Sequence, residues 1–393
     1  MDLPLLRLLI LYVTAVVLVA SAALWAIFEY NLPPFNNARA VVSEAVASEP
    51  TSSTTLRSSQ VRRRDAGTPA IIEHDLTGRR FKSSPLPLSL PIDCEPGVDC
   101  WVFNFVDLDP GKGRRDFACG QMSYDTHKGT DFALSHFGRI NDLVPVRAAA
   151  SGRVLGSRDG MKDISVRVIG RAAIKGKECG NGVRIDHGGG WHTQYCHMKR
   201  GTVLVGSGDL VRAGDRIGAV GLSGLTEFPH LHLTVEKDGE VIDPFIGLSG
   251  GEECDVGAAP LWRGEVLDKL RYLSGIPYNI GFAGHVPKVE EFRAGKLDGT
   301  SLSASSKALV FWAEIAGLRP KDVVATRFYG PDGGLLAEKE QTIDKHKIRI
   351  WTAVGKKSST SWPTGVYRGE VTVQRKTPSG LKQSRREARL DVY

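Results

Sequence analysis

Short apolar runs separated by glycine-rich turns dominate the chain from residue 119 to residue 245. Apolar and polar residues alternate at Pro145–Ala148, Gly152–Leu155, Gly182–Asp186 and Ile217–Val220. Such runs, bounded by turn residues, are typical of β-strands. Their close spacing favours pairing between neighbours in the sequence, so we expect a compact antiparallel β domain here.

A second β-rich region follows residue 301. Its apolar or alternating runs are Ala308–Ile315, Val323–Tyr329, Ile348–Val354, Val366–Val373 and Ala388–Val392. A turn sequence at Gly330–Gly333 follows the second run, as expected between two strands. This strand density favours an immunoglobulin-like β-sandwich, although the Cys…Trp…Cys pattern of true immunoglobulin domains is absent. Before this region, a short helix is predicted around Val266–Leu273.

The N-terminal segment has a different composition. Leu8–Phe28 contains no charged residue, and a helix of this length crosses a hydrocarbon core of about 30 Å. Cleavage at the small residues Ala20–Ala22 would leave an exposed apolar stretch, so we favour an uncleaved signal anchor, with secretion after cleavage as the alternative. The polar, Ser/Thr/Pro/Arg-rich stretch that follows cannot form a core and predicts a flexible linker.

These patterns predict a mainly β protein in five segments. They are a membrane anchor at 1–30, a linker at 31–90, a β domain at 91–250 with its core at 119–246, a connector at 251–300 and a β-sandwich accessory domain at 301–393. The chain of 393 residues is 41% hydrophobic and 24% charged, which argues against wholesale disorder and against a multi-span membrane protein. Its net charge of +7 suits an anionic partner, and no nucleic-acid-binding motif is present.

Four of the ten histidines occur in three short motifs, His127–Asp131, Tyr195–Met198 and Pro229–His232. Because side chains alternate along a strand, His230 and His232 share one face while the intervening leucine points to the other. An isolated His-x-His pair more often consists of two polar residues on the solvent-exposed face of a strand. Two imidazoles and a carboxylate, however, hold Zn²⁺ while leaving a fourth position for water, as catalytic zinc sites do.

The order of these motifs resembles the lysostaphin/LytM-type zinc endopeptidases, which cut the peptide cross-links or stems of bacterial peptidoglycan. The resemblance runs from Cys119 to Phe245 and includes the His-x-Gly-x-Asp, Tyr-x-His and His-Leu-His motifs and the Gly-Asp-x-Ile-Gly pattern at Gly214–Gly218. The sequence departs from the family pattern at an insertion that includes Gly170–Lys177 and at a longer loop, Leu225–Phe228. We expect both to line a substrate groove.

The resemblance implies a division of roles among five residues. His127, Asp131 and His232 would be the zinc ligands, and His197 and His230 the unliganded catalytic pair. His197 would help to deprotonate or orient the attacking water, and His230 would stabilise the oxyanion or protonate the leaving amine. The sequence does not decide which of the two histidines performs which step.

An exported location makes disulfides more probable than thiol ligands for the six cysteines. If Asp186 opposes Trp191 across a glycine turn, Cys179 and Cys196 fall on one face of a hairpin, whereas a slip of one residue would separate them. We therefore predict the pairs Cys179 with Cys196, Cys94 with Cys100, and Cys119 with Cys254.

Three functions follow. The first is an active peptidoglycan endopeptidase tethered to the inner membrane of a bacterium, with its catalytic domain in the periplasm or cell envelope. The second is a LytM-like regulator that activates another wall hydrolase without cutting, although such regulators typically lack ligands that are all present here. The third is a zinc peptidase acting on exported proteins. The sandwich is predicted to bind the wall or a protein partner, or merely to pack on the catalytic domain.

Overall fold

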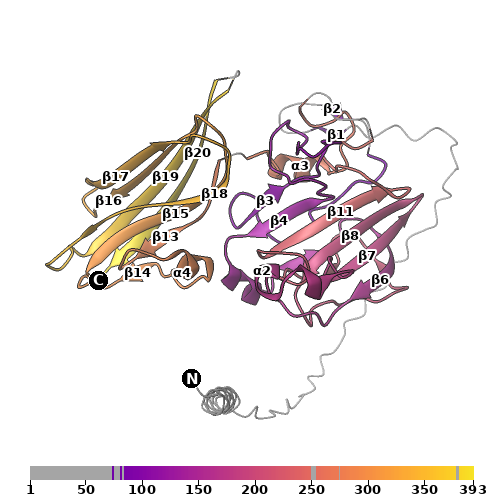
Figure 1. Ribbon diagram of the computed structural model, residues 1–393, viewed down its shortest axis with the longest axis horizontal. Helices are drawn as coiled ribbons and strands as arrows, with labels where there is room; N and C mark the ends of the chain where they lie inside the picture. The colour runs from indigo at the N-terminus through magenta and orange to yellow at the C-terminus, as the bar shows by residue number, and fades with distance from the viewer. Residues whose placement is uncertain (1–72, 75–79, 82–83, 249–253, 274, 378–379) are drawn as a thin grey trace, which may run out of the picture. The chain divides into compact units, whose positions relative to one another are not determined.

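The structure is a computed structural model that describes residues 73–74, 80–81, 84–248, 254–273, 275–377 and 380–393 (Figure 1). The predicted anchor and most of the predicted linker lie outside these residues. Among the described residues, none of the helices is both long and apolar enough to cross a membrane. The described chain is mainly β, with antiparallel sheets, as predicted.

An eight-stranded sheet forms the first β region, with the order β3-β4-β11-β8-β7-β6-β9 and with β12 paired to β11. Its strands are β3 Cys100–Asn104, β4 Thr130–Leu134, β6 Gly152–Arg158, β7 Asn181–Gly188, β8 Trp191–Met198, β9 Leu210–Val211, β11 His230–Lys237 and β12 Glu240–Val241. Every pairing is antiparallel. Beside it, β5 Pro145–Arg147 pairs with β10 Arg216–Ala219. All four alternating runs of the sequence are therefore strands.

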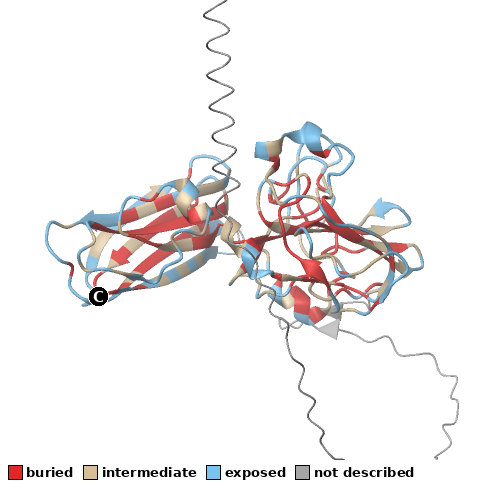
Figure 2. Ribbon diagram, turned by 90° about the horizontal axis from the view of Figure 1, so that it is seen from below, coloured by how far each residue is buried: buried red, intermediate tan, exposed pale blue. Residues whose placement is uncertain are grey.

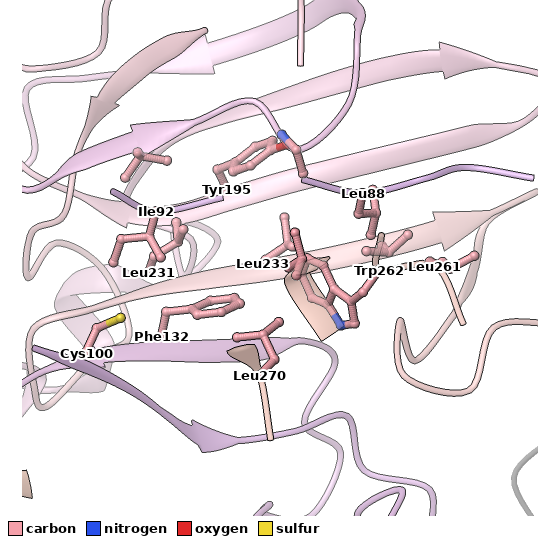
Figure 3. Close-up of a cluster of buried hydrophobic side chains, with 14 of the residues drawn as sticks. Leu88, Ile92, Cys100, Phe132, Tyr195, Leu231, Leu233, Leu261, Trp262 and Leu270 are labelled. Atoms are coloured by element: carbon pink, nitrogen blue, oxygen red, sulfur yellow. The ribbon is translucent and has the colours of Figure 1, made fainter. Parts of the chain in front are cut away.

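One face of this sheet is covered by a hydrophobic cluster. Leu231 and Leu233 of β11 are fully buried in it, and they lie beside Phe132 of β4 and Tyr195 of β8 (Figure 3). The cluster also contains Leu88, whose backbone NH donates to the carbonyl of Leu261 at 2.7 Å. Core packing thus begins within the stretch whose composition predicts a linker, and it leaves the opposite face of β11 for the histidines.

The hairpin of β7 and β8 differs in register from the prediction. Asp186 pairs with His192, not Trp191, and irregularities flank the regular stretch at both ends. Gly188, Gly189 and Gly190 all have positive φ, so the turn is tighter than the predicted one and shifts the pairing by one residue. Cys179 still bonds to Cys196 because it lies before β7, where strand alternation no longer fixes its side.

Short helical segments connect the strands of the first region. They are η1 Phe137–Asp142, α2 Val166–Ile169 and η2 Arg171–Ile174. Of these, η2 lies in the predicted insertion Gly170–Lys177, and α2 directly precedes it. A small two-stranded pair, β1 Glu73–His74 with β2 Arg80–Phe81, precedes the first region.

The second β region contains a three-stranded sheet of order β13-β15-β18 and a five-stranded sheet of order β14-β20-β19-β16-β17. The strands are β13 Ile276–Ala283, β14 Ser301–Leu302, β15 Ala308–Leu318, β16 Val323–Tyr329, β17 Leu335–Thr342, β18 Lys347–Lys357, β19 Gly365–Thr377 and β20 Gly380–Val392. Both sheets contribute side chains to one hydrophobic cluster, and Figure 2 shows the buried residues along these strands. The five predicted runs are strands, and β13, β14 and β17 are additional. The helices are α3 Gly264–Lys269, which begins two residues before the predicted start and ends four residues before the predicted end, and α4 Val289–Arg293.

All three predicted disulfides are confirmed. Cys94 bonds to Cys100, Cys119 to Cys254, and Cys179 to Cys196. A set of structural disulfides fits an oxidising compartment.

Candidate metal centre and active site

Three side chains converge at the polar face of β11. His127 Nε2 lies 3.2 Å from Asp131 Oδ1 and 3.2 Å from His232 Nδ1. His232 Nδ1 lies 2.8 Å from the same carboxylate oxygen. Tetrahedral Zn²⁺ with N/O ligands at about 2.0–2.2 Å holds its ligand atoms about 3.3 Å apart. The predicted ligand set therefore offers one donor atom per residue at separations that fit such an ion.

Strand pairing brings these residues together. Asp131 on β4 is the direct cross-strand partner of His232 on β11. His127 precedes β4, and Gly129 lets this segment approach closely, because a Cβ at Gly129 would lie 2.7 Å from the His232 ring. The glycine of the His-x-Gly-x-Asp motif is thus required by contact with the third ligand.

A second set of contacts orients the first two ligands. The Nδ1 of His127 donates a hydrogen bond to the carbonyl of Phe105 at 2.7 Å. The lone pair of Nε2 is therefore free to bind a metal ion. The Nδ2 of Asn104 donates to Asp131 Oδ2 at 2.8 Å, so Oδ1 alone faces the histidines. Such outer contacts fix the ring orientation and the basicity of metal ligands.

His197 reaches the same face through an unusual backbone conformation. Tyr195 faces the core opposite Leu233, and strand alternation would send His197 to the core as well. His197 instead has φ +63°, and its ring centroid lies 4.7 Å from that of His230. Its Nδ1 donates to the carbonyl of Ser223 at 2.8 Å, leaving Nε2 without a proton.

His230 is held in a similar way. Its Nδ1 lies 2.8 Å from the carbonyl of Phe228 and 3.1 Å from the hydroxyl of Thr226. Its Nε2 lies 3.5 Å from Asp131 Oδ1. Both imidazoles outside the ligand set therefore tie one nitrogen to the backbone and direct the other toward the metal centre.

Burial and the Asp131 carboxylate determine the charges at the site. Burial alone would raise the pKa of Asp131, but His127 and His230 hold this pKa well below its usual value. Burial lowers the pKa of His197 well below its usual value, and nearby His230 and His232 add to the effect. Burial also lowers the pKa of His232, against the attraction of Asp131. An ionised carboxylate beside neutral imidazoles is the state in which these groups bind a metal ion.

Asp131 acts differently on the other two histidines. Burial opposes the charged form of His127 and of His230, but the neighbouring carboxylate outweighs it and raises the pKa of each. These two rings are consequently the ones that hold a proton most readily when no cation shares the carboxylate.

The five residues singled out in the sequence are thus brought to one face of the sheet. A second grouping that could hold an ion, His197 with His230 and His232, overlaps the first but lacks a carboxylate to balance the charge. The contacts of Asn104 and of the Phe105 and Ser223 carbonyls were not anticipated. Asn104 is the cross-strand partner of Asp131, so a correct strand assignment for β3 could have found it, whereas the carbonyls carry no sequence signal.

Comparison with known proteins gives the family of this site. A family model described as peptidase family M23 matches residues 125–244, a range that contains all five residues. The chain carries a peptidase family M23 domain. The predicted lysostaphin/LytM-type family is thereby confirmed.

Curated relatives of the M23 domain include uncharacterised metalloproteases, a cell division protein and a DD-carboxypeptidase/endopeptidase. An uncharacterised metalloprotease of Haemophilus influenzae is 30% identical over 118 residues, which cover 30% of this chain and 20% of that protein. The cell division protein DipM of Caulobacter vibrioides is 30% identical over 125 residues, covering 30% of this chain and 19% of DipM. The DD-carboxypeptidase/endopeptidase Mpg of Neisseria meningitidis is 28% identical over 159 residues, covering 39% and 31%. The matched part spans a third or less of each of these relatives.

Solved structures that are similar to part of the chain include two catalytic domains. One is that of the prophage-encoded M23 protein EnpA from Enterococcus faecalis, at 21% identity and a TM-score of 0.26, covering 40% of this chain and 94% of that one. The other is that of lysostaphin from Staphylococcus simulans, at 21% identity and a TM-score of 0.23, covering 36% and 86%.

Proposed function

We propose that this chain is a zinc endopeptidase that hydrolyses amide bonds in the peptide cross-links or stems of peptidoglycan. The observation that carries the proposal is the arrangement at β11. Three donor atoms from His127, Asp131 and His232 meet within 3.2 Å of one another, and two further imidazoles face the same point. A purely structural metal site would not need two further imidazoles, those of His197 and His230, beside its ligands.

The metal and the two imidazoles have separate tasks in this proposal. Zn²⁺ held by the three ligands would supply Lewis acidity, which polarises the scissile carbonyl and acidifies water. His197 and His230 each present a free Nε2, which lets one ring accept the proton of the attacking water. The other ring donates to the developing oxyanion or to the leaving amine. Their backbone contacts with Ser223 and Phe228 keep both rings oriented without substrate.

The surroundings of the domain support an extracytoplasmic place of action. Three disulfides fit the periplasm or another oxidising compartment. We propose that the apolar stretch Leu8–Phe28 anchors the chain in the bacterial inner membrane, that the linker connects it to the M23 domain, and that the second β region is an immunoglobulin-like accessory domain. In this proposal two boundaries shift from those predicted: core packing already includes Leu88, within 31–90, and the second region already includes β13 from Ile276, within 251–300.

The test is digestion of purified sacculi by the unit Gly67–Tyr393 loaded with zinc. The wild-type unit should release soluble muropeptides. His230→Ala should lower the rate by about 100- to 10,000-fold, the usual loss on removing a general acid or base, and Asp131→Ala should abolish zinc binding and release together. Stoichiometric zinc without any released muropeptides from the wild type would contradict the proposal and favour a non-cutting regulator.

A further inference from the structure

We propose that the hollow between η2 and the loop 224–228 is a subsite for a carboxylate of the peptide substrate, with Arg171 and Lys175 as its cationic rim. The inference rests on the proposed peptidase function and names the chemistry that its substrate presents. The hollow measures about 290 Å³ and is lined by Arg171, Ala172, Ile174, Lys175, Glu178 and Leu225.

The floor and the rim of the hollow differ in chemistry. Ile174 is buried, Leu225 is half-buried, and both offer apolar surface. Arg171 and Lys175 are exposed, and among the described residues neither has a carboxylate within ion-pair distance. An apolar floor with free cations at its edge matches an amino acid that carries a short aliphatic stem and a terminal carboxylate.

The acidic residues that flank Gly170–Lys177 accept hydrogen bonds from backbone NH groups. Asp159 accepts the backbone NH groups of Gly201 and Val203, and Asp163 accepts that of Leu222. Glu178 also lines the hollow. Backbone hydrogen bonds, among them one from the NH of Gly176 at 2.8 Å, lower its pKa, and the charges of Arg158 and Lys175 lower it further, so this carboxylate partly balances the charge of Lys175.

Of the basic residues, Arg167 is already paired with Glu227 at 2.6 Å. Among the described residues, Arg171, Lys175 and Lys177 of the insertion form no ion pair, and Arg171 and Lys175 are the two that line the hollow.

The hollow adjoins the catalytic histidine His230. The NH of Leu225 donates to the carbonyl of Glu178 at 2.7 Å, and the NH of Val166 donates to the carbonyl of Thr226 at 2.9 Å. Thr226 is in turn 3.1 Å from the Nδ1 of His230 through its hydroxyl. One loop therefore forms a wall of the hollow and orients an imidazole of the catalytic pair.

The experiment compares pairs of synthetic peptides that differ only in a carboxylate or a carboxamide at one residue flanking the scissile bond. The full zinc-loaded chain should cleave the carboxylate peptide of one pair with kcat/KM about 3- to 10-fold higher, the scale of one or two solvent-exposed charge pairs. Arg171→Ala should remove most of this preference through KM, and Arg171→Lys should keep part of it. Arg389→Ala, which removes an exposed cation of β20, should leave it unchanged.

Dissociation constants of the same peptides, measured by fluorescence anisotropy, separate the two proposals. A carboxylate preference in binding that Arg171→Ala removes, without any cleavage, would overturn the peptidase function and keep the subsite. Equal binding and equal kcat/KM within every pair, or an equal loss for both peptides in Arg171→Ala, would overturn the subsite while leaving the peptidase function intact.

Discussion

At the scale of single residues, His197 shows how one backbone angle completes the site. The Tyr-x-His motif suggested that His197 belongs with the other histidines, but regular strand geometry places it on the core face with Tyr195. The left-handed conformation at His197 reverses its side. Its backbone is held there by two hydrogen bonds, from its NH to the Cys179 carbonyl and from the Gly221 NH to its own carbonyl.

Asn104 is predicted to control metal affinity. Its amide fixes the free oxygen of Asp131, so Asn104→Ala should let the carboxylate turn and should raise the zinc dissociation constant about 10- to 100-fold, as losses of outer contacts do. Competition with a chromophoric chelator measures this constant. Gln383→Ala, an exposed change on β20, is the matched control, and an unaltered constant for Asn104→Ala would show that the amide has no such role.

Asp243 gives a prediction for the pH dependence of stability. Burial raises its pKa to about 7, and its Oδ2 has no hydrogen-bond partner among the described residues. The folded state thus binds a proton that the unfolded state releases near pH 4, so the contribution of Asp243 is favourable at low pH and is lost as the pH rises from about 4 to about 7.

Asp243→Asn keeps an acceptor for the NH of Phe245 and removes this titration. Relative to wild type, the variant should gain about 3 kcal/mol of unfolding free energy between pH 5 and pH 8, because about two pH units of this titration fall in the range. Urea unfolding at the two pH values measures the gain, with the exposed Asp238→Asn as control. A constant difference between variant and wild type across this range would refute the assignment.

The convergence of the five candidate residues could be predicted because their side chain types, His and Asp in short motifs, are themselves the chemical signal. Asn104 could not, because an asparagine in an unassigned segment is as common in turns as in sites. The carbonyls that set the histidine tautomers belong to Phe105, Ser223 and Phe228, and their side chains have no part in that role.

At the scale of elements, the β7–β8 hairpin links stability to the site. The disulfide Cys179–Cys196 closes a sequence separation of 17 residues, which restricts the unfolded chain by about 3 kcal/mol in the loop-entropy account. The double change of Cys179 and Cys196 to Ala should lower the unfolding free energy by about that amount.

The same change should also reduce turnover at saturating zinc, because the Cys179 carbonyl holds the NH of His197. Denaturant unfolding and sacculus digestion measure the two effects. The double change of Cys94 and Cys100 to Ala, which opens a separation of 6 residues, should cost less stability and spare turnover. The opposite ranking would count against the proposed link.

Strands with a clear apolar alternation were predictable, and those without it were not. β17 reads LLAEKEQT and lies at the edge of its sheet, where one strand neighbour is enough and polar residues are tolerated. β13 contains Pro277 and Asn279. The side chain of Asn279 is buried and donates a hydrogen bond to Glu314. Tertiary partners, which local sequence does not reveal, stabilise such strands.

At the scale of the molecule, both β regions belong to one compact unit, Gly67–Tyr393. Trp101 of β3 and Tyr278 of β13 share a hydrophobic cluster, with ring centroids 6.0 Å apart. Arg386 of β20 donates to the carbonyl of Val98 at 2.9 Å, across 288 positions of sequence. The second region therefore packs against β3, the strand that carries Asn104. Contacts over such separations have no local sequence pattern, which is why the sequence left the role of this region open.

The most direct test of the account measures zinc content and turnover on the same preparation of His197→Asn. Asparagine tolerates the left-handed backbone of this position, and His197 is not among the proposed metal ligands. We expect one zinc per chain, as in the wild type, together with a loss of muropeptide release of at least about 100-fold. Zinc retained with wild-type release would contradict the division between three ligands and two catalytic histidines.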